Sequence, residues 1–201
     1  GQHPRGAGAD EGVPGVVSNI FPSLPEEPKL FDVFKRFPDS FAPLLEYHDR
    51  VLRSDNQLTI GERELIAAYV SSLNACSFCY NAHEVFARAH GIAPDTIDAL
   101  LDDPNSAAVE PKLRPILAYV RKLTLTPAKM VKADSQAVFD AGWTEEALFA
   151  AIQTCAIFNL MNRIVDGTGV TPTGESSEAG NAADLPRMDS YAAVVQSLGL
   201  K

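Results

Sequence analysis

Two cysteines and a histidine stand close together in the chain, in the order Cys76-Ser77-Phe78-Cys79 followed by His83. If this segment is helical, spacings of three and four residues bring the three side chains together as one stripe. The apolar face of the same helix is expected to comprise Phe78, Ala82, Val85, Phe86 and Ala89. A stripe at the flank of that face is dry enough to shift a pKa and open enough to admit a small molecule.

This arrangement suits thiol redox chemistry. A thiolate, not a thiol, is the nucleophile, and an imidazole one turn beyond Cys79 can take its proton. A thiolate that attacks a peroxide O–O bond becomes a sulfenic acid, which a second nearby thiol converts into a disulfide. Cys79, next to the base, is therefore the expected attacking group, and Cys76 the expected resolving group.

A carboxylate on the preceding segment can complete the site. Glu64 lies twelve residues before Cys76, beside the apolar residue Leu65. If the two helices pack antiparallel around a short turn at 73–75, Glu64 can approach His83, orient its ring and raise its basicity. Taken alone, Glu64 is equally well interpreted as a surface carboxylate.

Other interpretations of the CxxC pair stay open. A structural zinc site needs four ligands, but the chain has only one other cysteine, Cys155, and three other histidines, none paired at ligand spacing. We therefore predict no metal site. An inert pair of thiols is a further alternative, because free cysteine packs well in cores. Cys155, which shares a face with Leu148 and Ile152, is expected to be such a core thiol.

The elements that position these residues are predicted to be helices throughout. Helix caps, glycines and prolines divide the chain into six or seven helices, and no convincing strand alternation occurs. The sequence thus predicts an all-α, compact multi-helix bundle with extended terminal segments. We expect an N-terminal arm over residues 1–28, a helical domain over 29–169, and a C-terminal tail over 170–201 that carries a short helix.

Two of the predicted boundaries matter for the site. Thr59 and Glu62 fit the capping-box pattern and should begin the helix that carries Glu64. The reactive helix should run from about Asn74 to His90, where a glycine follows.

Length and charge exclude several function classes. The 201 residues (21.6 kDa) are 46% hydrophobic and 21% charged, which is ordinary for a folded domain. The net charge is −9 and no block of Lys or Arg residues occurs, so we expect no nucleic-acid partner. Neither a membrane span nor a secretory signal is apparent, so we expect no membrane partner and a cytoplasmic location.

The spacing of Glu64, Cys76, Cys79 and His83 resembles the core of the alkylhydroperoxidase D family (AhpD-like), within the carboxymuconolactone decarboxylase superfamily. The resemblance covers roughly residues 30–170. Within this range the sequence is similar to the peroxidase-related branch at three segments: Ala141-Gly142-Trp143-Thr144, Phe158-Asn159-Leu160-Met161-Asn162-Arg163 and Gly167-Thr168-Gly169-Val170. It implies an all-α fold and a homo-oligomer (trimer, dimer or hexamer). It also implies that Cys79 is peroxidatic, that Cys76 resolves, and that Glu64 and His83 relay protons to the thiol with the help of water.

One position departs from the best-characterised branch, which has a histidine immediately before the second cysteine. Phe78 stands there in this chain, so any role of that second imidazole is lost while the reaction class is retained. The decarboxylases of the superfamily lack the CxxC pair, which argues against lactone decarboxylation here.

We therefore expect a thiol-dependent alkyl hydroperoxidase, a peroxidase-type oxidoreductase that reduces a hydroperoxide substrate through a dithiol/disulfide cycle. No flavin, haem or nicotinamide motif is present, so we predict no cofactor and an external dithiol or lipoyl-type reductant. Two alternatives stay open: a general protein disulfide oxidoreductase, and a non-enzymatic helical oligomer with an idle CxxC.

Overall fold

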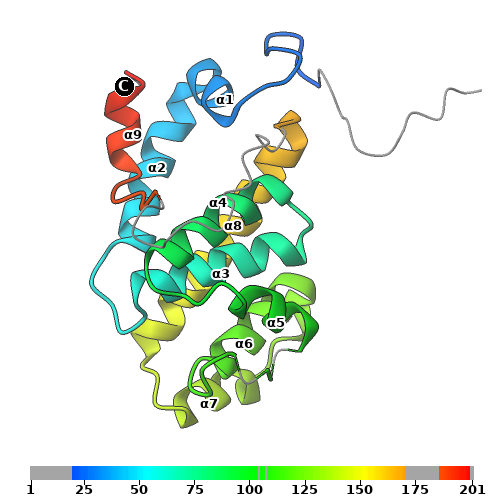
Figure 1. The fold of residues 1–201 in the computed structure, drawn as a ribbon, viewed down its shortest axis with the longest axis vertical. Helices are drawn as coiled ribbons and strands as arrows, with labels where there is room; N and C mark the ends of the chain where they lie inside the picture. The colour runs from blue at the N-terminus through cyan, green and yellow to red at the C-terminus, as the bar shows by residue number, and fades with distance from the viewer. Residues whose placement is uncertain (1–19, 104, 107, 171–185, 200–201) are drawn as a thin grey trace, which may run out of the picture.

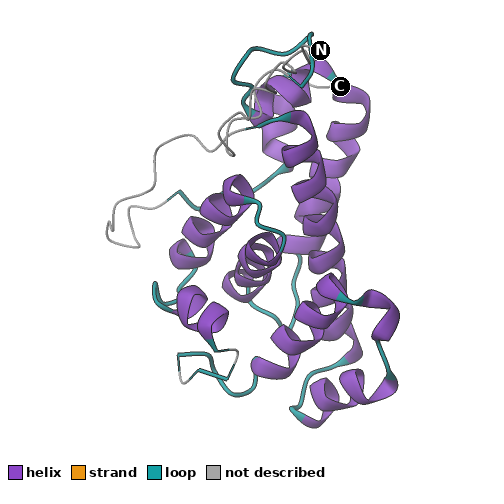
Figure 2. Ribbon diagram, turned by 90° about the vertical axis from the view of Figure 1, so that its right-hand side faces the viewer, coloured by secondary structure: helices purple, strands orange, loops and turns teal. Residues whose placement is uncertain are grey.

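The structure is a computed structural model that describes residues 20–103, 105–106, 108–170 and 186–199. Only helices and loops occur within these ranges (Figure 2), which confirms the all-α prediction. Most of the predicted N-terminal arm (residues 1–19) and residues 171–185 of the predicted tail lie outside the described residues.

The described helices are, in chain order, α1 (Leu30–Arg36), α2 (Pro38–Leu52), α3 (Ile60–Leu73), α4 (Ser77–Ala89), α5 (Thr96–Asp102), α6 (Arg114–Leu125), the 3-10 helix η1 (Pro127–Lys129), α7 (Lys132–Asp140), α8 (Glu145–Thr168) and α9 (Ala192–Ser197). The described residues thus hold nine α-helices, more than the predicted six or seven. The difference comes from short pieces, since α1, α5 and α9 have only seven, seven and six residues.

Helix α3 is the centre of the fold. It packs against α4 along much of its length and also contacts α8, while α6 lies against both α3 and α8. In Figure 1, α3, α4 and α8 form the middle of the molecule, α5, α6 and α7 lie at one end, and α1, α2 and α9 lie at the other. The candidate site residues therefore lie on, or next to, the most buried helices of the chain.

The predicted start of α3 is confirmed by its cap. The Thr59 hydroxyl accepts a hydrogen bond from the Glu62 amide at 3.1 Å, and the Glu62 carboxylate accepts one from the Thr59 amide at 2.7 Å. This reciprocal capping box fixes where α3 begins. It thereby fixes which face of the helix Glu64 occupies, one turn further on.

Helix α8 is the longest helix described, with 24 residues. By length and hydropathy it could cross a membrane, with a mean hydropathy of 1.4 over its most apolar window, yet 56% of that window is buried inside the fold. Burial of this extent is what a core helix shows. Thr144 caps its N-terminus and Gly169, at φ 75°, ends it in the left-handed region.

A buried arginine holds the connection between α2 and α3. Arg63 is 2% exposed, and its guanidinium donates hydrogen bonds to the Val51 carbonyl at 3.0 Å and the Ser54 carbonyl at 2.8 Å. Burial lowers the pKa of Arg63, yet an arginine stays protonated. These bonds fix the C-terminal end of α2, where Arg53 reaches the site.

The C-terminal segment docks on α2. The Asp49 carboxylate accepts hydrogen bonds from the Ser190 hydroxyl (2.7 Å) and from the amides of Tyr191 (2.5 Å) and Ala192 (3.0 Å). Arg53 donates two more, of 2.9 and 2.7 Å, to the Met188 carbonyl. A segment remote in sequence is thereby brought against the helices that carry the site residues.

Two glycines provide a matched test of this packing. A Cβ atom at Gly61 would lie 2.6 Å from the His90 carbonyl oxygen, whereas one at Gly167 would meet nothing within 4 Å. We expect Gly61→Ala to lower the free energy of unfolding by about 1–3 kcal/mol, because α3 and α4 must move apart. We expect Gly167→Ala to raise it by about 0.5 kcal/mol, because alanine favours the helix.

Urea denaturation of both variants measures the two effects. A Gly61→Ala protein as stable as the parent would show that α3 and α4 do not approach as closely as described.

Candidate active site

The reactive helix begins later than predicted. Helix α4 starts at Ser77 rather than at about Asn74, and Cys76 is its N-cap residue with extended backbone. The chain changes direction at Ala75, a non-glycine residue with φ 57°. Cys76 therefore lies just outside the helix and Cys79 in its first turn, where the unpaired N–H groups of the helix N-terminus favour a negative charge.

The predicted orientation of α4 is correct for Ala89, which is buried, but not for the larger apolar side chains. Cys79 and His83 are buried and face the core, together with Ala87. Phe78 and Phe86, predicted to be on the core face, are only partly buried and line a cavity. The helical spacing predicted that the larger apolar side chains of this segment face the core. Polar groups on α3 and α8 instead hold the imidazole and the thiols on the inner side.

The predicted pairing of Glu64 with His83 is present. The His83 Nδ1 atom lies 2.6 Å from a Glu64 carboxylate oxygen, and Glu64 is completely buried. The alternative of a surface carboxylate is thereby excluded. The close packing of α3 and α4 brings the two residues together although they are 19 positions apart.

Two further residues hold the other oxygen of Glu64. The Arg53 guanidinium lies 2.6 Å from it, and the Tyr191 hydroxyl donates a hydrogen bond to it at 3.2 Å. Arg53 also lies over the Tyr191 ring, 5.0 Å from its centroid. Sequence reasoning missed both residues: Arg53 follows a predicted helix with no motif around it, and Tyr191 lies on the remote tail.

The ionised Glu64 carboxylate determines which nitrogen of the His83 ring must carry a hydrogen. Burial opposes ionisation of Glu64, but His83 and Arg53 together hold its pKa below the ordinary value. An ionised carboxylate only accepts hydrogen bonds, so the Nδ1 atom of His83 carries the hydrogen. Nε2 is then the ring nitrogen that remains for proton exchange with a neighbouring thiol.

Aromatic rings fix the plane of this imidazole. The Phe158 ring lies edge-on to it with centroids 4.3 Å apart, and the Phe86 ring does so at 5.4 Å. With the carboxylate at one end and two rings against its faces and edges, His83 has little rotational freedom. A base held in this way needs little reorganisation to accept a proton.

The two thiols of the CxxC pair are inequivalent. A hydrogen bond from Cys76 lowers the pKa of Cys79; burial opposes this shift, and a second hydrogen bond, from Asn162, supports it. The same hydrogen bond to Cys79, together with burial, raises the pKa of Cys76. Cys79 is therefore the sulfur that carries negative charge when one proton leaves the pair.

Asparagines of α8 tie the start of α4 to the core. The Asn74 amide group donates to the side-chain oxygens of Asn159 (3.1 Å) and Asn162 (2.9 Å), and Asn162 donates to the Ser71 hydroxyl at 3.0 Å. These hydrogen bonds link α8 to the end of α3 and the turn before α4. Asn162 has the additional contact with Cys79, which sequence reasoning missed.

The third cysteine does not join the pair. Cys155 is 1% exposed, and its sulfur lies 3.3 Å from the Thr124 hydroxyl. Burial raises its pKa. Among the described residues, no group of three or more His, Cys, Asp or Glu side chains is placed to hold a metal ion.

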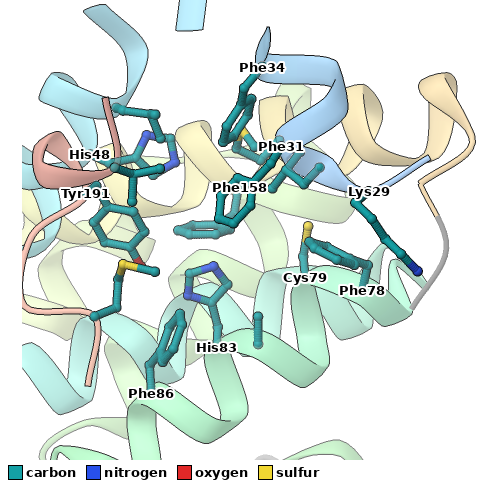
Figure 3. A pocket seen from close by; sticks show the side chains of 16 residues that line it. Lys29, Phe31, Phe34, His48, Phe78, Cys79, His83, Phe86, Phe158 and Tyr191 are labelled. Atoms are coloured by element: carbon teal, nitrogen blue, oxygen red, sulfur yellow. The ribbon is translucent and has the colours of Figure 1, made fainter. Parts of the chain in front are cut away.

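An apolar cavity of about 420 Å³ opens beside Cys79 and His83. Figure 3 shows both side chains pointing into it, with the rings of Phe31, Phe34 and Phe158 on the opposite walls. Its polar groups besides Cys79 and His83 are Lys29, His48 and Tyr191. Burial lowers the pKa of His48 to about 4, so this second imidazole is neutral at physiological pH.

Part of the chain and its overall fold resemble known proteins. Residues 38–122 match the carboxymuconolactone decarboxylase family, a segment that contains all four predicted site residues. No curated protein sequence matches the chain. The fold is similar to that of a peroxidase-related protein of Ralstonia eutropha JMP134, described as an alkylhydroperoxidase AhpD core, with a TM-score of 0.69 and 27% identity over 77% of this chain and 80% of that one.

Two more solved structures share the fold at lower identity. An uncharacterized peroxidase-related protein of Silicibacter sp. TM1040 has a TM-score of 0.67 and 23% identity, over 73% of this chain and 77% of that one. A cysteine-to-alanine variant of the debrominase Bmp8, in complex with 2,3,4-tribromopyrrole, has a TM-score of 0.62 and 17% identity over the same shares. The matched segment and the shared fold make this chain similar to AhpD-like proteins of the carboxymuconolactone decarboxylase superfamily.

Proposed function

We propose that this protein is a thiol-dependent alkyl hydroperoxidase. The observation that supports the proposal is the inequivalence of two adjacent thiols beside an imidazole that Glu64 holds in place, at the wall of an apolar cavity. An idle pair of core thiols would need neither the buried charge cluster around Glu64 nor an opening to the outside.

The proposed cycle begins at Cys79. Its thiolate attacks one oxygen of the hydroperoxide, the O–O bond breaks, and the leaving alkoxide takes a proton and departs as an alcohol. Cys79 is then a sulfenic acid. The Cys76 sulfur attacks it, a disulfide forms, and the hydroxyl leaves as water with the Cys76 proton. An external dithiol returns the pair to the reduced state.

His83 is the proposed general acid and base of this cycle. It shares the cavity wall with Cys79, and its Nε2 can accept the thiol proton, directly or through water, and pass it to the alkoxide. Glu64 keeps the ring in the required tautomer. Arg53 and Tyr191 are positioning residues, because they act on the thiol only through Glu64.

The cavity supports an organic substrate rather than hydrogen peroxide alone. A volume of about 420 Å³ lies within the range of small-molecule sites. Its aromatic walls contribute to binding only when an apolar group displaces water from them. We therefore expect an alkyl or aryl hydroperoxide to react faster than hydrogen peroxide.

Direct assays distinguish the proposed peroxidase from two other activities, protein disulfide exchange and debromination. A general disulfide oxidoreductase would act on protein disulfides without consuming hydroperoxide. The debrominase shares only the fold with this chain, so a brominated pyrrole serves as a comparison substrate from which we expect no bromide release.

The thiol inequivalence predicts a pH profile. We expect Cys79 to be alkylated by iodoacetamide with a midpoint below the ordinary thiol value of about 8.5, because the hydrogen bond from Cys76 stabilises its thiolate. The reaction is lost as the pH falls through the Cys79 pKa. Cys76→Ala should raise the midpoint, whereas Cys76→Ser, which keeps a donor, should raise it less. Mass spectrometry of the alkylated peptides measures each site, and a Cys79 midpoint above 8.5 would indicate an idle pair.

The cysteine roles predict different single turnovers. Mixed with cumene hydroperoxide, the Cys76→Ser protein should form one equivalent of sulfenic acid at position 79, whereas Cys79→Ser should form none. The parent protein should form the Cys76–Cys79 disulfide and leave Cys155 reduced, because Cys155 is buried beside Thr124. Dimedone trapping and peptide mapping measure these products. Sulfenic acid at Cys76 alone would reverse the roles, and no reaction in any variant would refute the peroxidase.

The relay predicts non-additive losses. His83→Ala should slow hydroperoxide reduction by about 10²–10⁴-fold, the usual contribution of a general base. Glu64→Gln should also slow it, and the double variant should be little worse than the worse single variant, because the two residues act as a unit. Additive losses would show that Glu64 does not act through the imidazole.

Glu64→Gln leaves Arg53 buried without its counter-charge, so its folding is checked by thermal denaturation. Tyr191→Phe provides the milder test, since it removes one hydrogen bond to Glu64 and keeps every charge. We expect a smaller rate loss together with a changed pH profile of the reaction.

A further inference from the structure

The two sulfurs of the CxxC pair face different openings. Cys79 lines the apolar cavity that also contains His83, and Cys76 does not. Cys76 instead lines a separate, shallower groove of about 250 Å³, which we call the Cys76 groove. The side chains around it include Ser72, Ser77, Tyr80 and Leu101. The N-terminus of α4 thus lies between two approaches, one to each sulfur.

We propose that the Cys76 groove is the entry of the reducing dithiol, which attacks the Cys76 sulfur of the oxidised pair. The inference rests on the proposed function, since it names the place where the disulfide formed in the cycle is reduced. It assigns the hydroperoxide and the reductant to opposite sides of the same disulfide, so neither has to leave before the other approaches.

The reducing step transfers two electrons. A thiolate of the external dithiol attacks the Cys76 sulfur, the Cys76–Cys79 bond breaks, and its electron pair leaves on Cys79. The second thiolate of the reductant then attacks the mixed disulfide, forms the reductant's own disulfide and releases Cys76, which takes a proton. The protein is reduced and the dithiol oxidised by two electrons each.

The direction of attack agrees with the chemistry of the leaving group. In thiol–disulfide exchange the sulfur with the lower pKa leaves faster. Hydrogen bonds from Cys76 and Asn162 stabilise negative charge on Cys79 in the reduced pair, and the Asn162 contact is independent of Cys76. Attack through the Cys76 groove therefore expels the better leaving group, whereas attack through the apolar cavity would expel the poorer one.

The groove limits the kind of reductant. Cys76 is only 1% exposed, so the flat surface of a folded protein cannot bring a cysteine to it. Besides Cys76, the lining side chains are serine hydroxyls, the phenol of Tyr80 and the aliphatic groups of Ala75 and Leu101, none of which carries a formal charge. A dithiol on a slender, uncharged aliphatic chain matches both properties. We use dihydrolipoamide as the probe and the charged tripeptide glutathione as the comparison.

The first experiment locates the attacked sulfur. The protein is oxidised with diamide, which forms the disulfide without a hydroperoxide, so the test remains valid if the peroxidase proposal fails. A limiting monothiol, 2-mercaptoethanol, is added and the freed cysteine is alkylated at once with N-ethylmaleimide. Fragmentation of the peptide should place 2-mercaptoethanol on Cys76 and the alkyl group on Cys79. The reverse placement would overturn the proposal.

The second experiment blocks the groove. Leu101 is 41% exposed at its edge, so Leu101→Trp should fold normally and narrow the entry. The matched control is Leu125→Trp, the same change at another exposed leucine of 48% exposure that lines neither opening. We expect Leu101→Trp to lower the rate constant for reduction by dihydrolipoamide about tenfold, the effect of a misfit in a binding site.

The control should leave that rate constant unchanged, and both variants should form sulfenic acid at the parent rate. Equal reduction rates in the two variants, or faster reduction of the parent by glutathione than by dihydrolipoamide, would overturn the proposal. Slower sulfenic acid formation in Leu101→Trp would do so as well, because it would show that the groove serves the hydroperoxide.

Discussion

The site depends on one buried negative charge. Glu64 is fully enclosed by the protein, and such a carboxylate is tolerated only when partners replace the water it has lost. Arg53 supplies the opposite charge, and His83 and Tyr191 supply hydrogen bonds. The same contacts join α2, α3, α4 and the C-terminal segment, so the stability of this region and the basicity of the imidazole share one cause.

Residues at the connection between α2 and α3 hold the partners of Glu64 in position. Arg63 binds the carbonyls of Val51, in the last turn of α2, and of Ser54, and the chain between them carries Arg53. Asp49 anchors the segment that carries Tyr191. Arg63 and Asp49, which do not line the cavity, thus hold the residues that bind Glu64. This is the pattern of a reactive group held by a rigid shell.

The proposed chemistry depends on the different surroundings of Cys76 and Cys79 and not only on the presence of two thiols. Cys76 lies at an N-cap and Cys79 in the first helical turn, so a single hydrogen bond between them lowers the pKa of one sulfur and raises that of the other. The two sulfurs also differ in access, since Cys79 lines the apolar cavity and Cys76 lines the Cys76 groove. The walls of the cavity beside Cys79 come from side chains of α1, α2, α4, α8 and the C-terminal segment, so residues far from the CxxC motif in sequence shape it.

The sequence by itself determined the helical class, the cap at Thr59, and the four residues Glu64, Cys76, Cys79 and His83, because each depends on local spacing along the chain or on a short motif. The family match includes those four residues. The tertiary structure decided the direction in which α4 faces and the start of that helix, since hydrogen bonds from α3 and α8 outweigh the local apolar pattern. It also brought Tyr191 to Glu64 across 127 positions. Contacts of that range leave no periodic signal in a sequence, because they depend on packing between whole helices and not on neighbours along one helix.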